Sequence, residues 1–132
     1  MKLDHVGIAV RSLERALQTY ANQLGFNVEK IVTIPEQGVN VAVLPCGESR
    51  IELLEPTNCA SPIYRFLEKR GEGIHHLCFK VDDIERKLAQ LKSTPIKLLS
   101  ETPCLGLDNR KISFLHPKSS HGVLIELVEE KD

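Results

Sequence analysis

The chain has 132 residues, 42% of them hydrophobic, which is enough to bury the core of one compact domain. Its 17 basic and 18 acidic residues give a formal charge of −1, and no run of lysines or arginines marks a nucleic-acid or membrane-surface protein. The apolar run at 6–10 is too short for a signal-peptide core or a membrane span. Four scattered cysteines without a C-x-x-C pair indicate no disulfide framework, so we expect a cytoplasmic protein with reduced thiols.

The first module begins with a predicted strand, DHVGIAV at 4–10, and continues into an amphipathic helix. Apolar residues recur with helical spacing from Leu13 to Leu24, while Ser12 and Gly25 stand where such a helix begins and ends. Segments rich in β-branched residues follow, separated by the turn sequences PEQG and PCGE. They predict three strands, at about 27–34, 39–44 and 49–55.

A short linker helix is predicted next, because Ser61 and Pro62 suit a cap and a first turn and Gly71 suits its end. A second amphipathic helix follows Asp83 and stops before Pro95. The strands predicted around it lie near 73–81, 96–101, 110–116 and 121–129. We therefore expect one domain over 1–132, with module one at about 1–57, the linker helix at about 61–71 and module two at about 73–130.

The sequence contains an internal repeat. A shift of 71 positions lays DHVGIAVRSLERAL, from Asp4, over HHLCFKVDDIERKL, and His5 then matches His76. A shift of 74 lays RIELLEP over LIELVEE, and Glu52 then matches Glu126. Each half therefore has a histidine near the start of its first strand and a glutamate in the middle of its last.

If two such modules pack with pseudo-twofold symmetry, His5, Glu52, His76 and Glu126 converge near the axis. Two imidazoles and two carboxylates suit a divalent ion such as Zn²⁺, Co²⁺, Ni²⁺ or Mn²⁺ and leave room for an oxygen-bearing substrate. A single glutamate of this kind more often faces water, and a single histidine more often bonds to a backbone carbonyl in the core. The repetition of both residues in both halves favours the metal site. His75 has no counterpart and is expected on the opposite face.

These phrases also resemble a known group of enzymes. DHVGIAV, PEQGV, IELLEP, SPIYRFLEKRGEGIHHLCFKVDDI and FLHPKSSHGVLIELVE are similar to motifs of the vicinal oxygen chelate (glyoxalase/bleomycin resistance protein/dioxygenase) superfamily, and within it to the methylmalonyl-CoA epimerase family. The resemblance implies an α+β fold, in which two tandem βαβββ modules related by pseudo-twofold symmetry form a curved mixed sheet around a metal site. It also implies a homodimer.

By the same resemblance, His5, Glu52, His76 and Glu126 are metal ligands, although some family members have glutamine where Glu52 stands. The implied reaction interconverts the 2R and 2S forms of methylmalonyl-CoA through a metal-stabilised enediolate. Glu126 is the candidate for a ligand that also exchanges a proton, and the reaction requires a second acid or base on the opposite face. The cofactor is one divalent ion per site, and the partner is a small acyl-CoA rather than nucleic acid or membrane.

Two features depart from the family pattern. A carboxylate that some members carry on the third strand is replaced by Val41, and the usually glycine-rich loop reads CLGLDNR at 104–110. Because of the second departure, other substrates and other activities are also compatible with the sequence. A lactoylglutathione lyase would use the same ligands, a ring-cleaving dioxygenase would need two histidines and one carboxylate for Fe(II), and a binding protein on this scaffold would need no metal.

Overall fold

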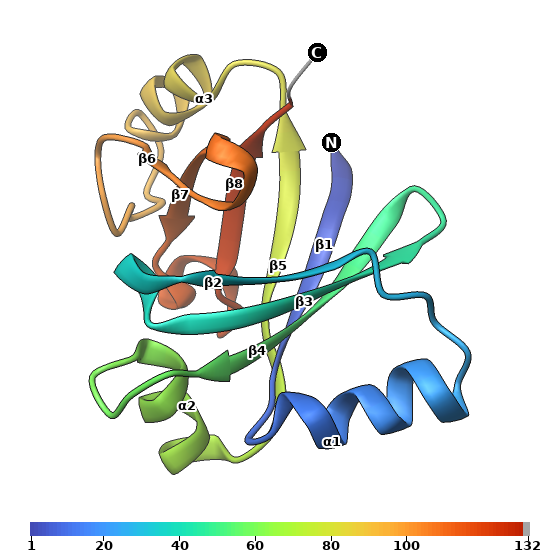
Figure 1. Cartoon of the computed structure of the whole chain (residues 1–132). Helices are drawn as coiled ribbons and strands as arrows, with labels where there is room; N and C mark the ends of the chain where they lie inside the picture. Colours follow the sequence, from blue (N-terminus) through green and yellow to red (C-terminus); the bar gives the residue numbers. More distant parts are fainter. Residues whose placement is uncertain (131–132) are drawn as a thin grey trace. The chain divides into compact units, whose positions relative to one another are not determined.

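The structure, a computed structural model, describes residues 1–130. The chain divides into two compact units. We call residues 5–75 the amino-terminal unit, and residues 76–130 together with residues 1–4 the carboxy-terminal unit. In each of them a strand is followed by a helix and further strands, which confirms the predicted α+β fold built from two tandem βαβββ modules (Figure 1).

The amino-terminal unit contains a mixed four-stranded sheet in the order β2-β3-β4-β1. β1 and β4 run parallel, whereas the β2–β3 and β3–β4 pairs are antiparallel. Its elements are β1 (Lys2–Ala9, which starts in the other unit), α1 (Leu13–Leu17), η1 (Gln18–Gln23), β2 (Lys30–Ile34), η2 (Pro35–Gln37), β3 (Val39–Cys46), β4 (Ser49–Pro56) and α2 (Pro62–Arg70).

The carboxy-terminal unit repeats this plan, with the strand order β5-β8-β7-β6. β5 and β8 run parallel, and the β7–β8 and β6–β7 pairs are antiparallel. Its elements are β5 (Gly73–Val81, whose first residues belong to the other unit), α3 (Ile84–Leu91), β6 (Cys104–Leu105), η3 (Leu107–Asn109), β7 (Lys111–Leu115), η4 (Pro117–Ser120) and β8 (Ile125–Glu129).

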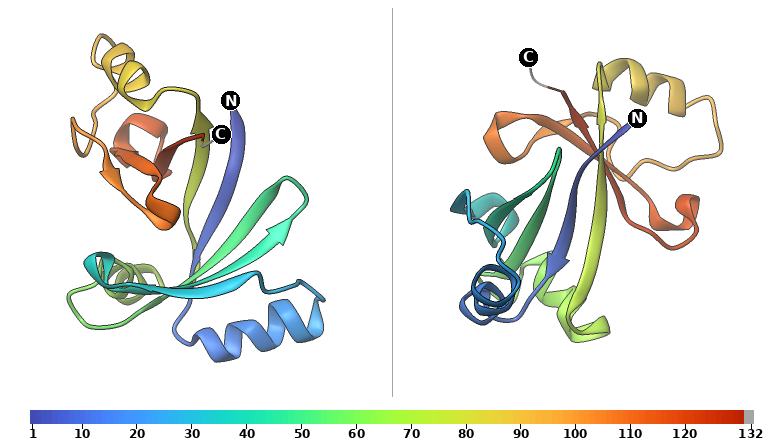
Figure 2. Two further views of the ribbon diagram at one scale, coloured as in Figure 1. Left: turned by 45° about the horizontal axis from the view of Figure 1, so that its top comes forward. Right: turned by 90° about the vertical axis from the view of Figure 1, so that its right-hand side faces the viewer.

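A helix covers one face of the sheet in each unit, as the two views of Figure 2 show for α1 and α3. Every second residue of a strand faces the helix and enters the core, and full burial of one such aliphatic side chain stabilises the fold by roughly 1.5–3 kcal/mol. The core under α1 consists of Val10, Leu13, Ala42, Leu44 and Leu53. The core under α3 consists of Val81, Ile84, Leu88, Leu91, Leu115 and Leu127. The opposite face of each sheet is left for the predicted histidines and glutamates.

The helix predicted from Leu13 is present, but it widens after one and a half turns. Ser12 caps it as expected, its hydroxyl accepting a hydrogen bond from the Arg15 N–H. From Gln18 the helix is a π-helix, in which the Leu24 N–H bonds to the Thr19 carbonyl five residues earlier. Nothing in the amphipathic spacing predicted this change.

The strand predicted at 96–101 is wrong. Leu98 makes only an isolated bridge to Leu115, and the short strand β6 lies later, at Cys104–Leu105. Polar residues interrupt the segment, since the Ser100 hydroxyl donates to the Thr102 carbonyl and bends the chain back on itself. The proline that follows has no N–H to donate to a ladder.

The last strand also starts later than the predicted 121, at Ile125. His121 adopts a left-handed conformation, with φ of 60°, at the end of η4 and is followed by Gly122 at φ of 95°. This turn occupies the residues that the strand was expected to include.

None of the helices in residues 1–130 combines the length and apolar composition needed to span a bilayer. All four cysteines are free thiols, and of these Cys78 alone is buried.

Candidate metal centre

The amino-terminal unit brings His5 and Glu52 together. The parallel pairing of β1 with β4 sets Gly7 beside Glu52 and His5 beside Arg50, so strand alternation puts His5 and Glu52 on the face opposite α1. The Nδ1 atom of His5 lies 3.3 Å from Oε2 of Glu52. The two residues are only 5% and 6% exposed.

The carboxy-terminal unit repeats this arrangement with His76 and Glu126. β5 pairs with β8 so that Cys78 stands beside Glu126, and the Nε2 atom of His76 lies 3.0 Å from Oε1 of Glu126. Their exposures are 6% and 7%. Phe114 on β7 faces Glu126 across the ladder and meets the His76 ring edge to face, with ring centroids 6.1 Å apart.

Burial decides between the two interpretations of the glutamates. A carboxylate at this depth is costly unless a hydrogen-bonding partner or a metal ion compensates it, so the interpretation in which these glutamates face water is wrong. Each pair presents an imidazole nitrogen and a carboxylate oxygen within about 3 Å of each other. This donor set fits a borderline divalent ion. The convergence of the two pairs on a single ion stays a prediction of the internal repeat.

The two adjacent histidines of β5 have different neighbours. His76 meets the glutamate, whereas His75 is partly exposed and packs edge to face against Phe66 of α2, with ring centroids 5.0 Å apart. The proximity of Arg50 was not predicted: its Nη2 atom lies 3.9 Å from Oε2 of Glu52. This guanidinium adds positive charge beside one of the two candidate ligand pairs.

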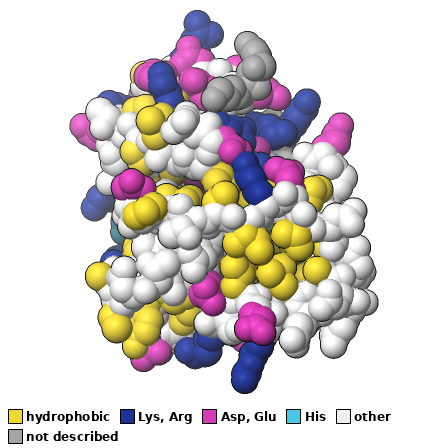
Figure 3. Space-filling view, viewed as in Figure 1, with side chains coloured by type: hydrophobic (Ala, Val, Ile, Leu, Met, Phe, Trp, Pro, Cys, Tyr) yellow, Lys and Arg dark blue, Asp and Glu magenta, His cyan; other side chains and the backbone are white. Residues whose placement is uncertain are grey.

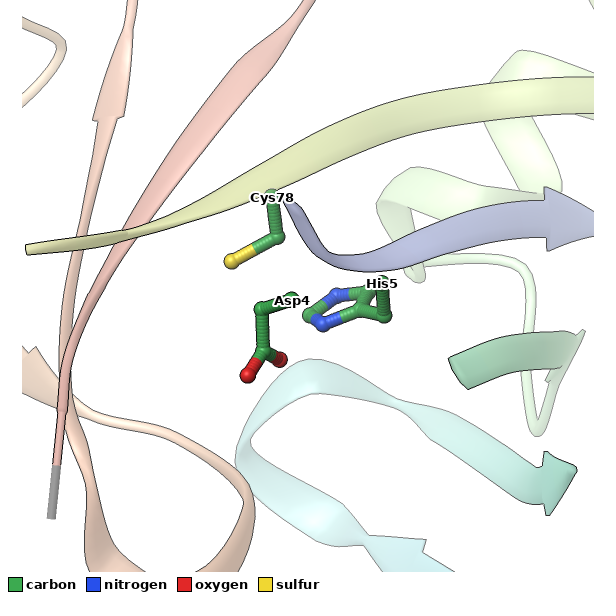
Figure 4. Close-up of side chains that lie close together, drawn as sticks. All are labelled: Asp4, His5 and Cys78. Atoms are coloured by element: carbon green, nitrogen blue, oxygen red, sulfur yellow. The ribbon is translucent and has the colours of Figure 1, made fainter. Parts of the chain in front are cut away.

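A buried ion pair joins the atypical loop at 104–110 to the start of β1. Asp4, which is 3% exposed, accepts a hydrogen bond of 3.0 Å from Nη1 of Arg110, and the Nε atom of the same arginine donates to the Glu129 carbonyl at 3.3 Å. Figure 4 shows the Asp4 carboxylate of β1 near the buried Cys78 thiol of β5, both in the carboxy-terminal unit. In the sequence, Arg110 stands out only as part of the loop that departs from the family pattern, and nothing there indicates its partner.

A second glutamate in each repeated phrase accepts a hydrogen bond from the start of a helix and lies on the face of the sheet opposite the candidate metal ligands. The Glu55 carboxylate accepts a hydrogen bond of 2.8 Å from the Leu13 N–H, and Glu129 accepts one of 3.1 Å from the Ile84 N–H. Each helix thus has its first turn capped from the last strand of its own module. The signal for this was present in the sequence, since both glutamates follow the candidate ligand by three residues and therefore face the other side of the strand.

Comparisons with known proteins agree with this architecture. A family model described as the Glyoxalase/Bleomycin resistance protein/Dioxygenase superfamily matches residues 4–114. Human mitochondrial methylmalonyl-CoA epimerase is 43% identical over 127 residues, which cover 96% of this chain and 72% of the relative. The crystal structure of methylmalonyl-CoA epimerase from Mycobacterium tuberculosis superimposes with a TM-score of 0.93 at 40% identity, covering 99% of this chain and 89% of that one. A Streptomyces coelicolor methylmalonyl-CoA epimerase variant in complex with 2-nitronate-propionyl-CoA gives a TM-score of 0.92 at 36% identity, covering 98% and 94%.

Proposed function

We propose, from the premise that this chain belongs to the Glyoxalase/Bleomycin resistance protein/Dioxygenase superfamily, that it is an epimerase interconverting the 2R and 2S forms of methylmalonyl-CoA. The observation that carries the proposal is the pair of buried histidine–glutamate contacts, one in each repeated module. Relatives named methylmalonyl-CoA epimerase match nearly the whole chain at about 40% identity and support the choice of substrate.

The proposed metal ligands are His5, Glu52, His76 and Glu126, which together would hold one divalent ion of cobalt, zinc, nickel or manganese. In this arrangement the two modules act as one catalytic domain. A bound ion of this kind acts as a Lewis acid that opposes the negative charge on the substrate oxygens after C2 loses its proton. The short contact between His76 and Glu126 keeps these two side chains in place before an ion binds.

Glu126 is the proposed group that exchanges a proton with C2 of the substrate. Its carboxylate is held at 3.0 Å from His76 and shielded from bulk water, which limits competing proton exchange with solvent. The reaction needs a second acid or base on the other face of C2. Val41 cannot be that group, because its hydrocarbon side chain carries no proton that could be transferred. Some family members have a carboxylate at the position of Val41. In this chain the second acid or base therefore comes from a different position.

We also propose that the protein works as a cytoplasmic homodimer. β2 lies at the edge of the amino-terminal sheet, and unpaired strand edges are common sites of association. Ile31 on β2 is 54% exposed, and Val28 just before it is also exposed. Figure 3 shows hydrophobic side chains gathered on the face that carries β2 and β3, a surface that a second copy of the chain would cover.

The proposal is tested by offering metal-loaded protein two substrates. With (2S)-methylmalonyl-CoA, chiral analysis should find an approach to an equal mixture of the 2R and 2S forms. With the hemithioacetal of methylglyoxal and glutathione, no lactoylglutathione should form. Formation of lactoylglutathione without epimerisation would contradict the proposal and would establish a lactoylglutathione lyase, an alternative that the unusual loop at 104–110 favours.

A further inference from the structure

The two modules repeat their histidine and glutamate but not the residue that comes two positions before the glutamate. The shift of 74 positions that lays Glu52 over Glu126 also lays Arg50 over Leu124. The first module therefore has a cation at this position, whereas the second has an aliphatic side chain. The repeat thus leaves one candidate ligand pair with a positive charge that its counterpart does not have.

Arg50 lies on the same face of the amino-terminal sheet as the candidate ligands. Residues two apart on a strand share a face, so Arg50 and Glu52 of β4 point the same way. Arg50 also stands beside His5 in the parallel β1–β4 ladder. Its Nη2 atom lies 3.9 Å from Oε2 of Glu52, and the same oxygen lies 3.3 Å from Nδ1 of His5. The guanidinium and the imidazole therefore approach the same carboxylate oxygen.

Burial makes this contact stronger than an ion pair at the surface. The side chains of Arg50 and Glu52 are only 19% and 7% exposed. Exposed ion pairs are screened by water and salt and contribute little, whereas buried charges are screened much less. A separation of 3.9 Å is too long for a hydrogen bond, so the guanidinium acts on the carboxylate through its charge. The same charge acts on any ion that the carboxylate binds.

We propose that Arg50 offsets the charge of Glu52 and thereby sets how tightly the site holds its divalent ion. The inference rests on the proposed function, because it takes Glu52 as a ligand of that ion. Glu52 and Arg50 together carry no net charge, as a glutamine ligand would, while Glu126 keeps its full negative charge. The guanidinium repels a cation at the Glu52 carboxylate and weakens its binding. The ion then keeps more of its positive charge for the oxygens of an anionic ligand. Arg50 is thus a positioning residue that acts through Glu52.

Calorimetry with Co²⁺ and metal-free protein tests the role of Arg50. The Kd for Co²⁺ should be about tenfold lower in Arg50→Gln than in the wild type, because a positive charge near the ion is removed. Arg50→Lys keeps the charge and should stay within about threefold of the wild-type Kd. The matched control is Arg15→Gln, which removes the same charge from the exposed side of α1 and should leave the Kd unchanged. A purely structural role of Arg50 gives the opposite sign, because a distorted site binds the ion more weakly.

A second titration measures the charge that the bound ion presents to oxygen ligands. Malonate, a small dicarboxylate, would be added to Co²⁺-loaded protein, and its Kd should be about tenfold higher in Arg50→Gln than in the wild type. Neither titration involves turnover, so both apply even if the protein is not an epimerase. An unchanged or higher Kd for Co²⁺ in Arg50→Gln, or an unchanged or lower Kd for malonate, would overturn the proposal. Wild-type protein that bound no Co²⁺ would instead refute the proposed metal site, and the role of Arg50 with it.

Discussion

The glutamates of the repeated phrases have two different roles, because strand alternation puts them on opposite faces of the sheet. Glu52 and Glu126 face the histidines, whereas Glu55 and Glu129 face the helices and cap them. Residues three apart on a strand point to opposite faces, so one short phrase serves both the site and the helix. The capping glutamates are therefore not metal ligands, although they belong to the same repeat.

The two candidate ligand glutamates should differ when each is changed to glutamine. Glu126→Gln should lower the rate of proton exchange at C2 at least about 100-fold, because an amide cannot take up the proton. Glu52→Gln should lower it by less than about tenfold, since an amide oxygen still binds a metal ion. Exchange rates and metal content of both variants would be measured together. Equal losses in the two variants would show that Glu126 acts only as a ligand.

The ion pair between Lys111 on β7 and Glu85 on α3 makes a prediction about pH. Nζ of Lys111 donates a hydrogen bond of 2.8 Å to Oε1 of Glu85, and this bond lowers the pKa of Glu85 below the ordinary glutamate value. In Lys111→Gln, an NMR titration should find the pKa of Glu85 raised toward that value, whereas Lys92→Gln should leave it unchanged. The pKa of Glu85 is lower in the folded protein than in the unfolded chain. The ion pair therefore stabilises the fold at pH values above the ordinary glutamate pKa. This contribution is lost as the pH falls through the lowered pKa of the folded protein. An unshifted pKa in Lys111→Gln would disprove the contact in solution.

At the scale of elements, each helix depends on a carboxylate from the last strand of its own module. Glu55→Gln and Glu129→Gln should each lower the free energy of unfolding by about 1 kcal/mol, because the first-turn N–H loses a charged acceptor at the positive end of the helix. Denaturant unfolding measures the loss. Glu48→Gln, at an exposed turn, is the control and should have no effect. The prediction fails if the capping variants are as stable as the control.

The loop at 104–110 is held by Arg110 through its buried contact with Asp4. Arg110→Met should lower the free energy of unfolding by about 3 kcal/mol, because the Asp4 carboxylate loses its arginine partner. The double variant Asp4→Asn/Arg110→Met should lose less than the sum of the two single variants. Unfolding of all three variants would be compared with the wild type. Additive losses would mean that the two residues do not interact.

The sequence predicted those features that depend on residues close together in the chain or on the internal repeat. Ser61 and Asp83 cap α2 and α3 as expected, and the internal repeat identified both histidine–glutamate contacts. It could not predict the Arg110–Asp4 ion pair, whose members are 106 positions apart and follow no period. The strand expected at 96–101 failed because its apolar residues make isolated rather than ladder contacts. Periodicity reports which face a residue takes, but not where a distant partner lies.

At the scale of the whole molecule, the chain repeats one module, and each copy supplies one imidazole and one carboxylate. Neither module alone has the four protein ligands that the proposed site requires. Metal binding should therefore depend on both modules, and the activity should depend on the metal.

The most direct test is NMR observation of proton–deuterium exchange at C2 of methylmalonyl-CoA in D₂O. Protein treated with a chelator and protein reloaded with a divalent ion would be compared, with His76→Ala as the matched variant. We predict rapid exchange with the reloaded protein, no exchange above the uncatalysed rate with the stripped protein, and no recovery in His76→Ala. Equal exchange by stripped and reloaded protein, or no exchange by protein that holds one ion per chain, would contradict the account.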